Sequence, residues 1–188
     1  DVFSFPWLKY RVDAPSSGAE YMVQLHYRPS RENEFYVRYR SVNKSINVVD
    51  PDYPLATVIN RVRQTLRMHF NLRINEVFRF RSRIENVWYE QKSGFMIYTD
   101  ALFKPKLRKV SGNVRLQYFE TDDYDTRLYA FENDVLYSYS IPMIYGKGVR
   151  YYLNLRYNVL RNLSLWARIA QTNYLDRNEI GSGLDKIE

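Results

Sequence analysis

Arginines recur at every second position in several segments of this 188-residue chain. A guanidinium group is permanently charged and donates hydrogen bonds in a planar fork that matches carboxylate and phosphate oxygens. A row of such groups can draw anions into a pore or bind a polyanion. Alternatively, carboxylates cross-link the row internally, for which Glu85, Glu90, Asp100 and Asp13 are the candidates. The arginines in these rows are Arg38, Arg40, Arg61, Arg63, Arg67, Arg73, Arg79, Arg81, Arg83, Arg150, Arg156 and Arg168.

Other polar residues give weaker indications of a functional site. Carboxylates gather in one stretch, at Asp122, Asp123, Asp125, Glu132 and Asp134. Clustered oxygen ligands can hold Ca²⁺, but this spacing fits no defined calcium loop. We therefore favour a solvated acidic loop, with a loop that folds back onto the arginines as the alternative.

The two histidines, His26 and His69, lie on polar parities without a nucleophile or carboxylate patterned beside them, which favours hydrogen bonding over catalysis. Gly146-Lys147-Gly148 lacks the frame of a phosphate-binding loop and is predicted to be a turn. We accordingly expect no enzymatic activity, no metal site and no cofactor.

The arginine rows belong to segments with a period of two. In 61–75 one parity is basic and the other is apolar, as in Val62, Leu66 and Phe70. Successive side chains of a strand point to opposite faces, so this pattern predicts a ribbon with one basic and one apolar side. Its length of about 15 residues exceeds the roughly 5–6 residues of an average globular strand and suits a membrane-crossing strand.

Similar alternation recurs along the whole chain, and no convincing amphipathic helix appears. The predicted strands run near 5–12, 20–28, 34–43, 59–74, 76–90, 94–104, 111–120, 148–159 and 162–174. Short connections are expected at 29–33, 74–76, 104–109 and 160–162, and long ones around 43–60 and 121–147. Short turns on one side and long loops on the other are typical of outer-membrane barrels.

Composition agrees with this fold class. Aromatic residues make up 16% of the chain, mean hydropathy is -0.52, and no apolar run approaches a membrane helix. We predict an all-β, antiparallel up-and-down transmembrane β-barrel, of which this chain holds about nine strands. Arginines on the lipid side would cost about 2–4 kcal/mol each at the midplane, so the basic parity should face the lumen.

The chain is expected to be one barrel domain fragment spanning 1–188. For strand directions to agree, residues 121–147 must form one long external excursion or projecting hairpin that returns to the side it left. Because bacterial barrels normally have an even number of strands, we expect a further strand after Glu188 and more before Asp1.

Several sequence segments resemble those of a known protein group. They are FPWLKYRVDAPSSG (Phe5–Gly18), YRPSREN (Tyr27–Asn33), YAFENDVLYS (Tyr129–Ser138), YGKGVRYYL (Tyr145–Leu153) and GSGLDKIE (Gly181–Glu188). These segments are similar to the C-terminal part of large outer-membrane barrel proteins of Bacteroidota that are labelled helix-hairpin-helix domain proteins. The resemblance implies location and fold more than activity. It assigns DNA binding to no residue here.

The leading hypothesis is a non-enzymatic barrel of the bacterial outer membrane, acting as a channel, a transport component or a membrane scaffold. Its expected partners are outer-membrane lipid or lipopolysaccharide and other subunits of a membrane complex. Nucleic acid would be reached only through a periplasmic domain outside this chain. The alternatives are a soluble ligand-binding β-barrel and a barrel enzyme.

Overall fold

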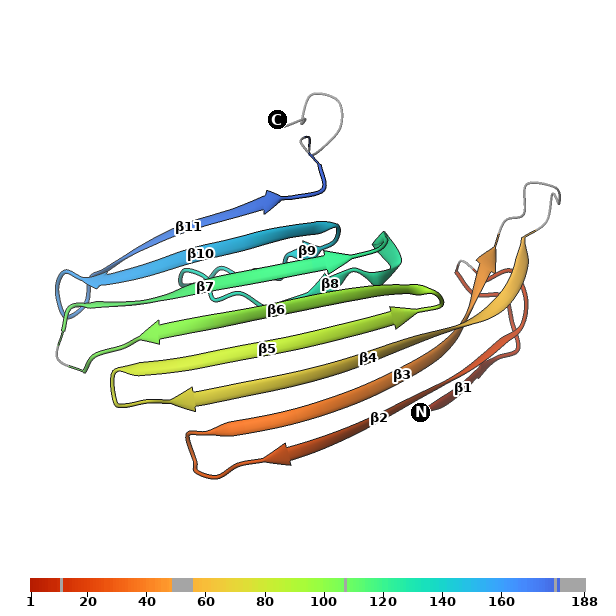
Figure 1. The fold of residues 1–188 in the computed structure, drawn as a ribbon, viewed down its shortest axis with the longest axis horizontal. Helices are drawn as coiled ribbons and strands as arrows, with labels where there is room; N and C mark the ends of the chain where they lie inside the picture. Colours follow the sequence, from red (N-terminus) through yellow and green to blue (C-terminus); the bar gives the residue numbers. More distant parts are fainter. Residues whose placement is uncertain (11, 49–55, 107, 178, 180–188) are drawn as a thin grey trace.

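The computed structural model describes residues 1–10, 12–48, 56–106, 108–177 and 179. The described chain is all-β, and its nine-stranded sheet is antiparallel and up-and-down (Figure 1). Along the sheet the strands are β1 (Val2–Phe5), β2 (Ser16–Tyr27), β3 (Glu34–Val48), β4 (Thr57–Arg73), β5 (Phe78–Tyr89), β6 (Lys92–Phe103), β7 (Val110–Thr121), β10 (Lys147–Asn158) and β11 (Ser164–Tyr174).

The sheet is open, with β1 and β11 at its two edges, so the described residues do not close into the predicted barrel. Among these residues no helix has the length and apolar character needed to cross a membrane. The confirmed part of the predicted fold class is therefore the antiparallel up-and-down sheet.

Eight of the nine predicted strands overlap an observed strand, but the first prediction was wrong. The expected strand at 5–12 is absent, because β1 ends at Phe5 and the described residues that follow it form only an isolated bridge between Lys9 and Val12. Pro6 offers no backbone N–H for a sheet ladder, which explains why the strand stops there. The alternating pattern behind that prediction included residue 11, which lies outside the described residues.

Four short connections lie together at one end of the sheet, here called the turn end. They join β2 to β3, β4 to β5, β6 to β7 and β10 to β11, as the alternating short and long connections predicted. Asn75 shapes one of them, since its side-chain Oδ1 accepts hydrogen bonds from the backbone N–H groups of Val77 and Phe78, both at 2.8 Å. The opposite end, the loop end, carries the end of β3, the start of β4 and the segment 121–147. It also carries the short turn between Tyr89 and Lys92, which departs from the predicted alternation of short and long connections.

One face of the sheet, here called the apolar face, leaves large hydrophobic side chains exposed on most of its strands. Leu25 is 73% exposed, Leu116 63% and Ile169 69%, although all three lie on regular strands. Other members of the apolar face are Tyr21, Val23, Tyr27, Val37, Val62, Phe80, Ile97, Val114, Tyr151, Leu153, Leu155 and Leu165. A hydrophobic surface that crosses a whole sheet is unusual for a water-soluble monomer.

Aromatic side chains border the apolar face near both ends of the strands. At the turn end Tyr27 stacks on Phe35, which meets Phe70 edge-on at 5.7 Å between ring centroids. Towards the loop end Phe95 packs against Tyr118 at 6.4 Å between ring centroids. Two aromatic rows flanking an apolar band are typical of membrane barrels.

Residues 121–147, here called the excursion, fold back over the other, polar face of the sheet. The excursion contains η1 (Tyr124–Thr126) and the two-residue strands β8 (Leu128–Tyr129) and β9 (Met143–Ile144), which pair with each other. Figure 1 shows it beside β6, β7 and β10. Its apolar side chains, with those of the sheet, form the small core Val87, Met96, Tyr98, Phe119, Leu128, Ala130 and Ile144.

Candidate anion-binding face

The pairing register places every predicted row arginine on the polar face. Arg38 lies opposite Arg67, which lies opposite Glu85; Arg79 lies opposite Arg73. Because side chains alternate along a strand, each of these positions fixes the face of its neighbours two residues away. The excursion covers part of this face, which therefore divides into a covered half over β5, β6, β7, β10 and β11 and an uncovered half over β2, β3 and β4.

In the covered half, carboxylates of the excursion neutralise Arg150 of β10 and Arg168 of β11. The Glu132 side chain, 0% exposed, accepts from Arg150 at 2.6 and 2.9 Å and from Arg168 at 2.5 Å. Arg168 also pairs with Asp134. A charge-assisted, bidentate arrangement of this kind fixes the excursion against β10 and β11. Of the sequence alternatives for Glu132 and Asp134, the structure shows the one in which they fold back onto the arginines.

The deepest arginine on this face, Arg115 of β7, was missing from the predicted rows. Its guanidinium group donates to both oxygens of Asp100, at 2.5 and 2.7 Å, and to the carbonyl oxygen of Phe131 at 2.8 Å. It also lies over the ring of Tyr98, 3.7 Å from the centroid, and both ion-pair partners are buried. Arg115 shares the polar parity of its strand, so the same alternation could have identified it.

In the uncovered half, some arginines pair with carboxylates of the sheet itself. Arg67 makes a bidentate pair with the buried Glu85 at 2.8 and 2.9 Å. Arg40 makes a similar pair with Glu20 at 2.6 and 2.8 Å, in a more exposed position. Arg61 pairs with Glu90, and Arg73 pairs with Glu32. Of the predicted cross-linking carboxylates, Asp13 accepts a hydrogen bond from the Asn47 amide, and no arginine of the described residues pairs with it.

The other predicted arginines have weaker or neutral partners. Arg81 lies 3.4 Å from Asp100, and Arg83 lies 3.8 Å from Glu85. Arg156 donates to the Asn158 side chain at 2.9 Å. For Arg79 no ion pair occurs within the part of the chain that is described. Thus some of the predicted arginines are cross-linked by carboxylates, as one of the sequence alternatives expected, whereas others have no close carboxylate partner among the described residues.

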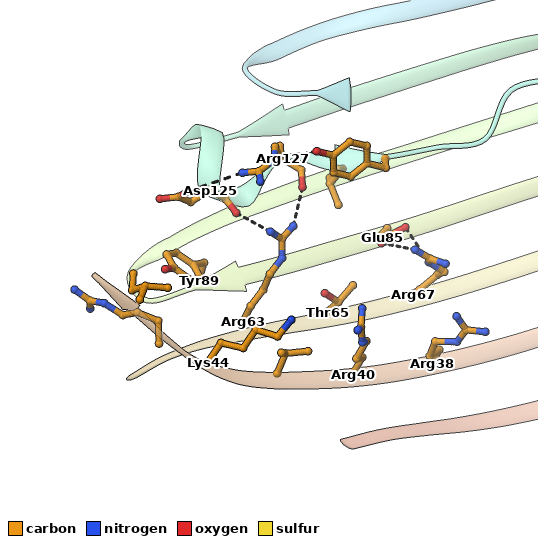
Figure 2. Close-up of a pocket in the computed structure, with 15 residues that line it drawn as sticks. Arg38, Arg40, Lys44, Arg63, Thr65, Arg67, Glu85, Tyr89, Asp125 and Arg127 are labelled. Atoms are coloured by element: carbon orange, nitrogen blue, oxygen red, sulfur yellow. Dashed lines mark hydrogen bonds and ion pairs between the residues drawn. The ribbon is translucent and has the colours of Figure 1, made fainter. Parts of the chain in front are cut away.

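A cleft of about 640 Å³ opens on the uncovered half near the loop end. Figure 2 shows Arg38, Arg40 and Lys44 side by side along β3 and Arg63 reaching from β4 to the excursion. The Arg63 guanidinium donates to the carbonyl oxygens of Asp125 at 2.9 Å and of Arg127 at 2.7 Å. The excursion thus forms one wall of the cleft, and β3, β4 and β5 form the rest.

The remaining acidic residues of the excursion do not converge on one point. Asp122 accepts from the Ser93 backbone at 2.6 Å. Asp123 caps η1 and pairs with Lys92, which lowers the pKa of the Asp123 carboxyl. Asp125 lies 3.9 Å from Arg127. Across the described residues, no three histidine or carboxylate side chains lie close enough together to hold a metal ion.

The histidines and the glycine turn lie apart from the cleft. His26 contacts Glu34 at 2.9 Å, and His69 stacks on Tyr36 at 5.0 Å between centroids. Of the predicted turn 146–148, only Gly146 lies outside a strand, with a φ of 82° that favours glycine. Lys147 and Gly148 are the first residues of β10, so the turn prediction was wrong for them. Lys147 pairs with Glu120 at 2.9 Å.

The fold and site together define a class: a long-stranded antiparallel sheet with one exposed apolar face and one arginine-rich face. Comparison with protein-family models, curated proteins and solved structures finds no match to this chain. Any functional assignment therefore rests on the physical chemistry of the two faces.

Proposed function

We propose that this chain forms part of the wall of a bacterial outer-membrane β-barrel, whose apolar face contacts lipid and whose basic face lines the lumen. The protein acts without catalysis, as a channel, a transport component or a membrane scaffold in a larger complex. The observation that carries the proposal is the exposed apolar face, on a sheet whose opposite face holds the charged residues.

Transfer energies support this orientation. Burying an exposed apolar side chain in hydrocarbon gains roughly 25 cal/mol per Å² of apolar area. An arginine at the midplane costs about 2–4 kcal/mol on the lipid side of a barrel. Only one orientation of the sheet gains the first energy and avoids the second cost. In it Leu116 and Ile169 face lipid, and Arg115 and Arg150 face away from it.

The long antiparallel strands support the same proposal. β3, β4 and β5 contain 15, 17 and 12 residues. A strand tilted by about 45° needs about 9–11 residues to cross the hydrocarbon. The resemblance to barrel proteins of Bacteroidota is consistent with this proposal and supplies its expected location, the outer membrane. In a closed barrel the excursion would lie inside the lumen and narrow it.

A soluble ligand-binding barrel is the second candidate, since its strands would also alternate. Such a barrel lines its interior with apolar residues and directs charged residues to water. Here the face that the excursion covers is the charged one, and the apolar face has no covering among the described residues. The packing of the excursion therefore favours the membrane proposal.

The full-length natural protein provides the test. In detergent, a folded membrane barrel should migrate differently on gels before and after boiling, and it should insert into lipid vesicles. A protein that stays soluble and monomeric without detergent, and does not insert, refutes the proposal.

Conductance separates a channel from a scaffold. In planar bilayers an open barrel should conduct with a preference for anions. Arg79→Glu, on the polar face, should shift the reversal potential towards cations, whereas Arg31→Glu, in the exposed turn between β2 and β3, should shift it less. Insertion without conductance would exclude the channel and retain the scaffold.

A further inference from the structure

The cleft of Figure 2 carries more positive charge than its carboxylates balance. Among the described residues that line it, basic side chains outnumber acidic ones by seven to two. Three of the basic side chains already pair with carboxylates of the sheet. The other four, Arg38, Lys44, Arg63 and Arg127, make no hydrogen bond to a carboxylate of the described chain.

Neutral groups hold three of these four side chains in place. Two backbone carbonyls fix Arg63, as described above, and Arg127 donates to the Tyr124 carbonyl at 2.8 Å and the Tyr129 hydroxyl at 3.0 Å. Arg38 donates to the Gln24 side-chain oxygen at 2.7 Å. Carbonyl, hydroxyl and amide oxygens orient a cation without cancelling its charge. Because a guanidinium has five N–H donors, each retains donors for a ligand.

The covered half of the same face shows the opposite arrangement. There the excursion supplies Glu132 and Asp134 to the arginines of β10 and β11. Near the cleft the excursion supplies mainly backbone carbonyls and a further arginine, Arg127, while the Asp125 carboxylate stays 3.9 Å from that arginine. The same segment thus neutralises one part of the face and leaves the other part cationic.

The dimensions of the cleft indicate the size of its ligand. A volume of about 640 Å³ falls within the roughly 300–1,000 Å³ of small-molecule sites. Arginine forks match the oxygen pairs of phosphate and carboxylate groups. Arg38, Lys44 and Arg63 have no carboxylate partner among the described residues, and Arg127 has only Asp125 at 3.9 Å. This excess of positive charge favours an anion with several such groups over a single halide ion.

We propose that this cleft binds a small multivalent oxyanion, bearing several phosphate or carboxylate groups, through Arg38, Lys44, Arg63 and Arg127. This proposal deepens the proposed function, because it names the class of solute that is held in the lumen. It rests on the proposed function for the route by which the ligand reaches the cleft. Arg150 of β10 and Arg168 of β11 are assigned to holding the excursion and not to the ligand.

Calorimetric titration of the full-length protein in zwitterionic detergent tests the site, with tripolyphosphate and citrate as probes. We expect saturable binding at a single site. Arg63→Gln and Arg38→Gln should each weaken binding about tenfold or more, since each removes charge-assisted hydrogen bonds. Arg38→Gln provides the second measurement in case Arg63→Gln loosens the excursion.

Arg79→Gln is the matched control, with the same substitution on the same face. Arg79 lies opposite Arg73, ten residues along β4 from Arg63, or about 33 Å at strand spacing. This separation exceeds the Debye length of about 10 Å at 0.1 M salt, so binding should change less than about threefold. Equal weakening by Arg79→Gln and Arg63→Gln, or no saturable binding of either probe, overturns the proposal.

Binding of only one probe supports the site and assigns the ligand to phosphates or to carboxylates. Vesicle insertion of the same preparations separates the two proposals. Insertion without probe binding refutes the cleft assignment alone, whereas probe binding by a protein that does not insert refutes the membrane assignment and retains the cleft.

Discussion

Replacing Glu132 by glutamine should release the excursion from the sheet. The Glu132 carboxylate is fully buried and bridges Arg150 and Arg168, which belong to different strands. Glutamine has nearly the same volume, so Glu132→Gln removes the negative charge and one acceptor while leaving little cavity. Two guanidinium groups, 16% and 17% exposed, then lose a shared counterion.

The magnitude follows from the cost of leaving a buried charge unpaired. Breaking a buried ion pair by removing one partner costs about 3–5 kcal/mol. Arg168 keeps its pair with Asp134, and Arg150 keeps a hydrogen bond to Thr172 at 2.6 Å, which places the expected cost near the lower limit. At 1.4 kcal/mol per tenfold change, about 3 kcal/mol raises the open population of the excursion roughly a hundredfold.

Native-state hydrogen exchange measures this population directly. The backbone N–H of Glu132 donates to the Ser140 carbonyl at 3.0 Å, and that of Asn133 donates to the Tyr152 hydroxyl at 3.2 Å. Both amides should exchange roughly a hundredfold faster in Glu132→Gln, while amides in the centre of β4 and β5 keep their protection.

Asp125→Asn is the matched control, because it removes the same charge from the same segment. The Asp125 carboxylate is 55% exposed and lies 3.9 Å from Arg127, and exposed pairs contribute about 0–1 kcal/mol. Exchange that rises less than about tenfold in Glu132→Gln, or equally in both variants, would refute the assignment of Glu132 as the anchor of the excursion.

Three further substitutions test other parts of the structure. Asp100→Asn leaves the buried Arg115 without its bidentate partner and should lower the free energy of unfolding in micelles by about 3–5 kcal/mol. Leu153→Arg, on the apolar face, should destabilise the protein in lipid vesicles by about 2–4 kcal/mol. Gly94→Ala should loosen η1 at a cost of about 1–3 kcal/mol, seen as faster exchange in the excursion, because a Cβ there would lie 2.5 Å from the Thr126 carbonyl oxygen.

Each of these three predictions has an outcome that would contradict it. A loss below about 1 kcal/mol in Asp100→Asn would mean that the ion pair does not hold the centre of the polar face. If Leu153→Arg costs no more than Leu136→Arg, an exposed site on the excursion, the apolar face does not meet lipid. Unchanged exchange in Gly94→Ala would show that η1 does not pack against β6.

The strands were predictable because their side chains alternate with a period of two. β4, from Thr57 to Arg73, coincides closely with the predicted 59–74, and its basic and apolar parities lie on the predicted opposite faces. The one failure, at 5–12, came from reading alternation through Pro6, whose missing N–H ends the ladder. Face assignment depends only on local geometry, and for this reason it could be read without an alignment.

The partners of the arginines could not be predicted in the same way. Arg150 and Glu132 are 18 positions apart in the sequence, and Arg63 and Asp125 are 62 positions apart. Glu132 and Asp125 both belong to the excursion, which has little regular secondary structure. Alternation places a side chain on a face but gives no information about which loop covers it. The acidic residues were recognised as a group, yet two of them neutralise arginines while the others bond to neighbours near the loop end.

The arginine rows show where the sequence is sufficient and where it is not. The residue order alone determines that one face of each strand is basic and the other apolar, since successive strand side chains must point to opposite sides. Only the tertiary structure decides which arginines are neutralised, because the excursion brings Glu132 and Asp134 to β10 and β11 and leaves Arg38, Lys44 and Arg63 facing an open cleft. Charge balance depends on contacts between distant segments, and these contacts exist only once the chain has folded.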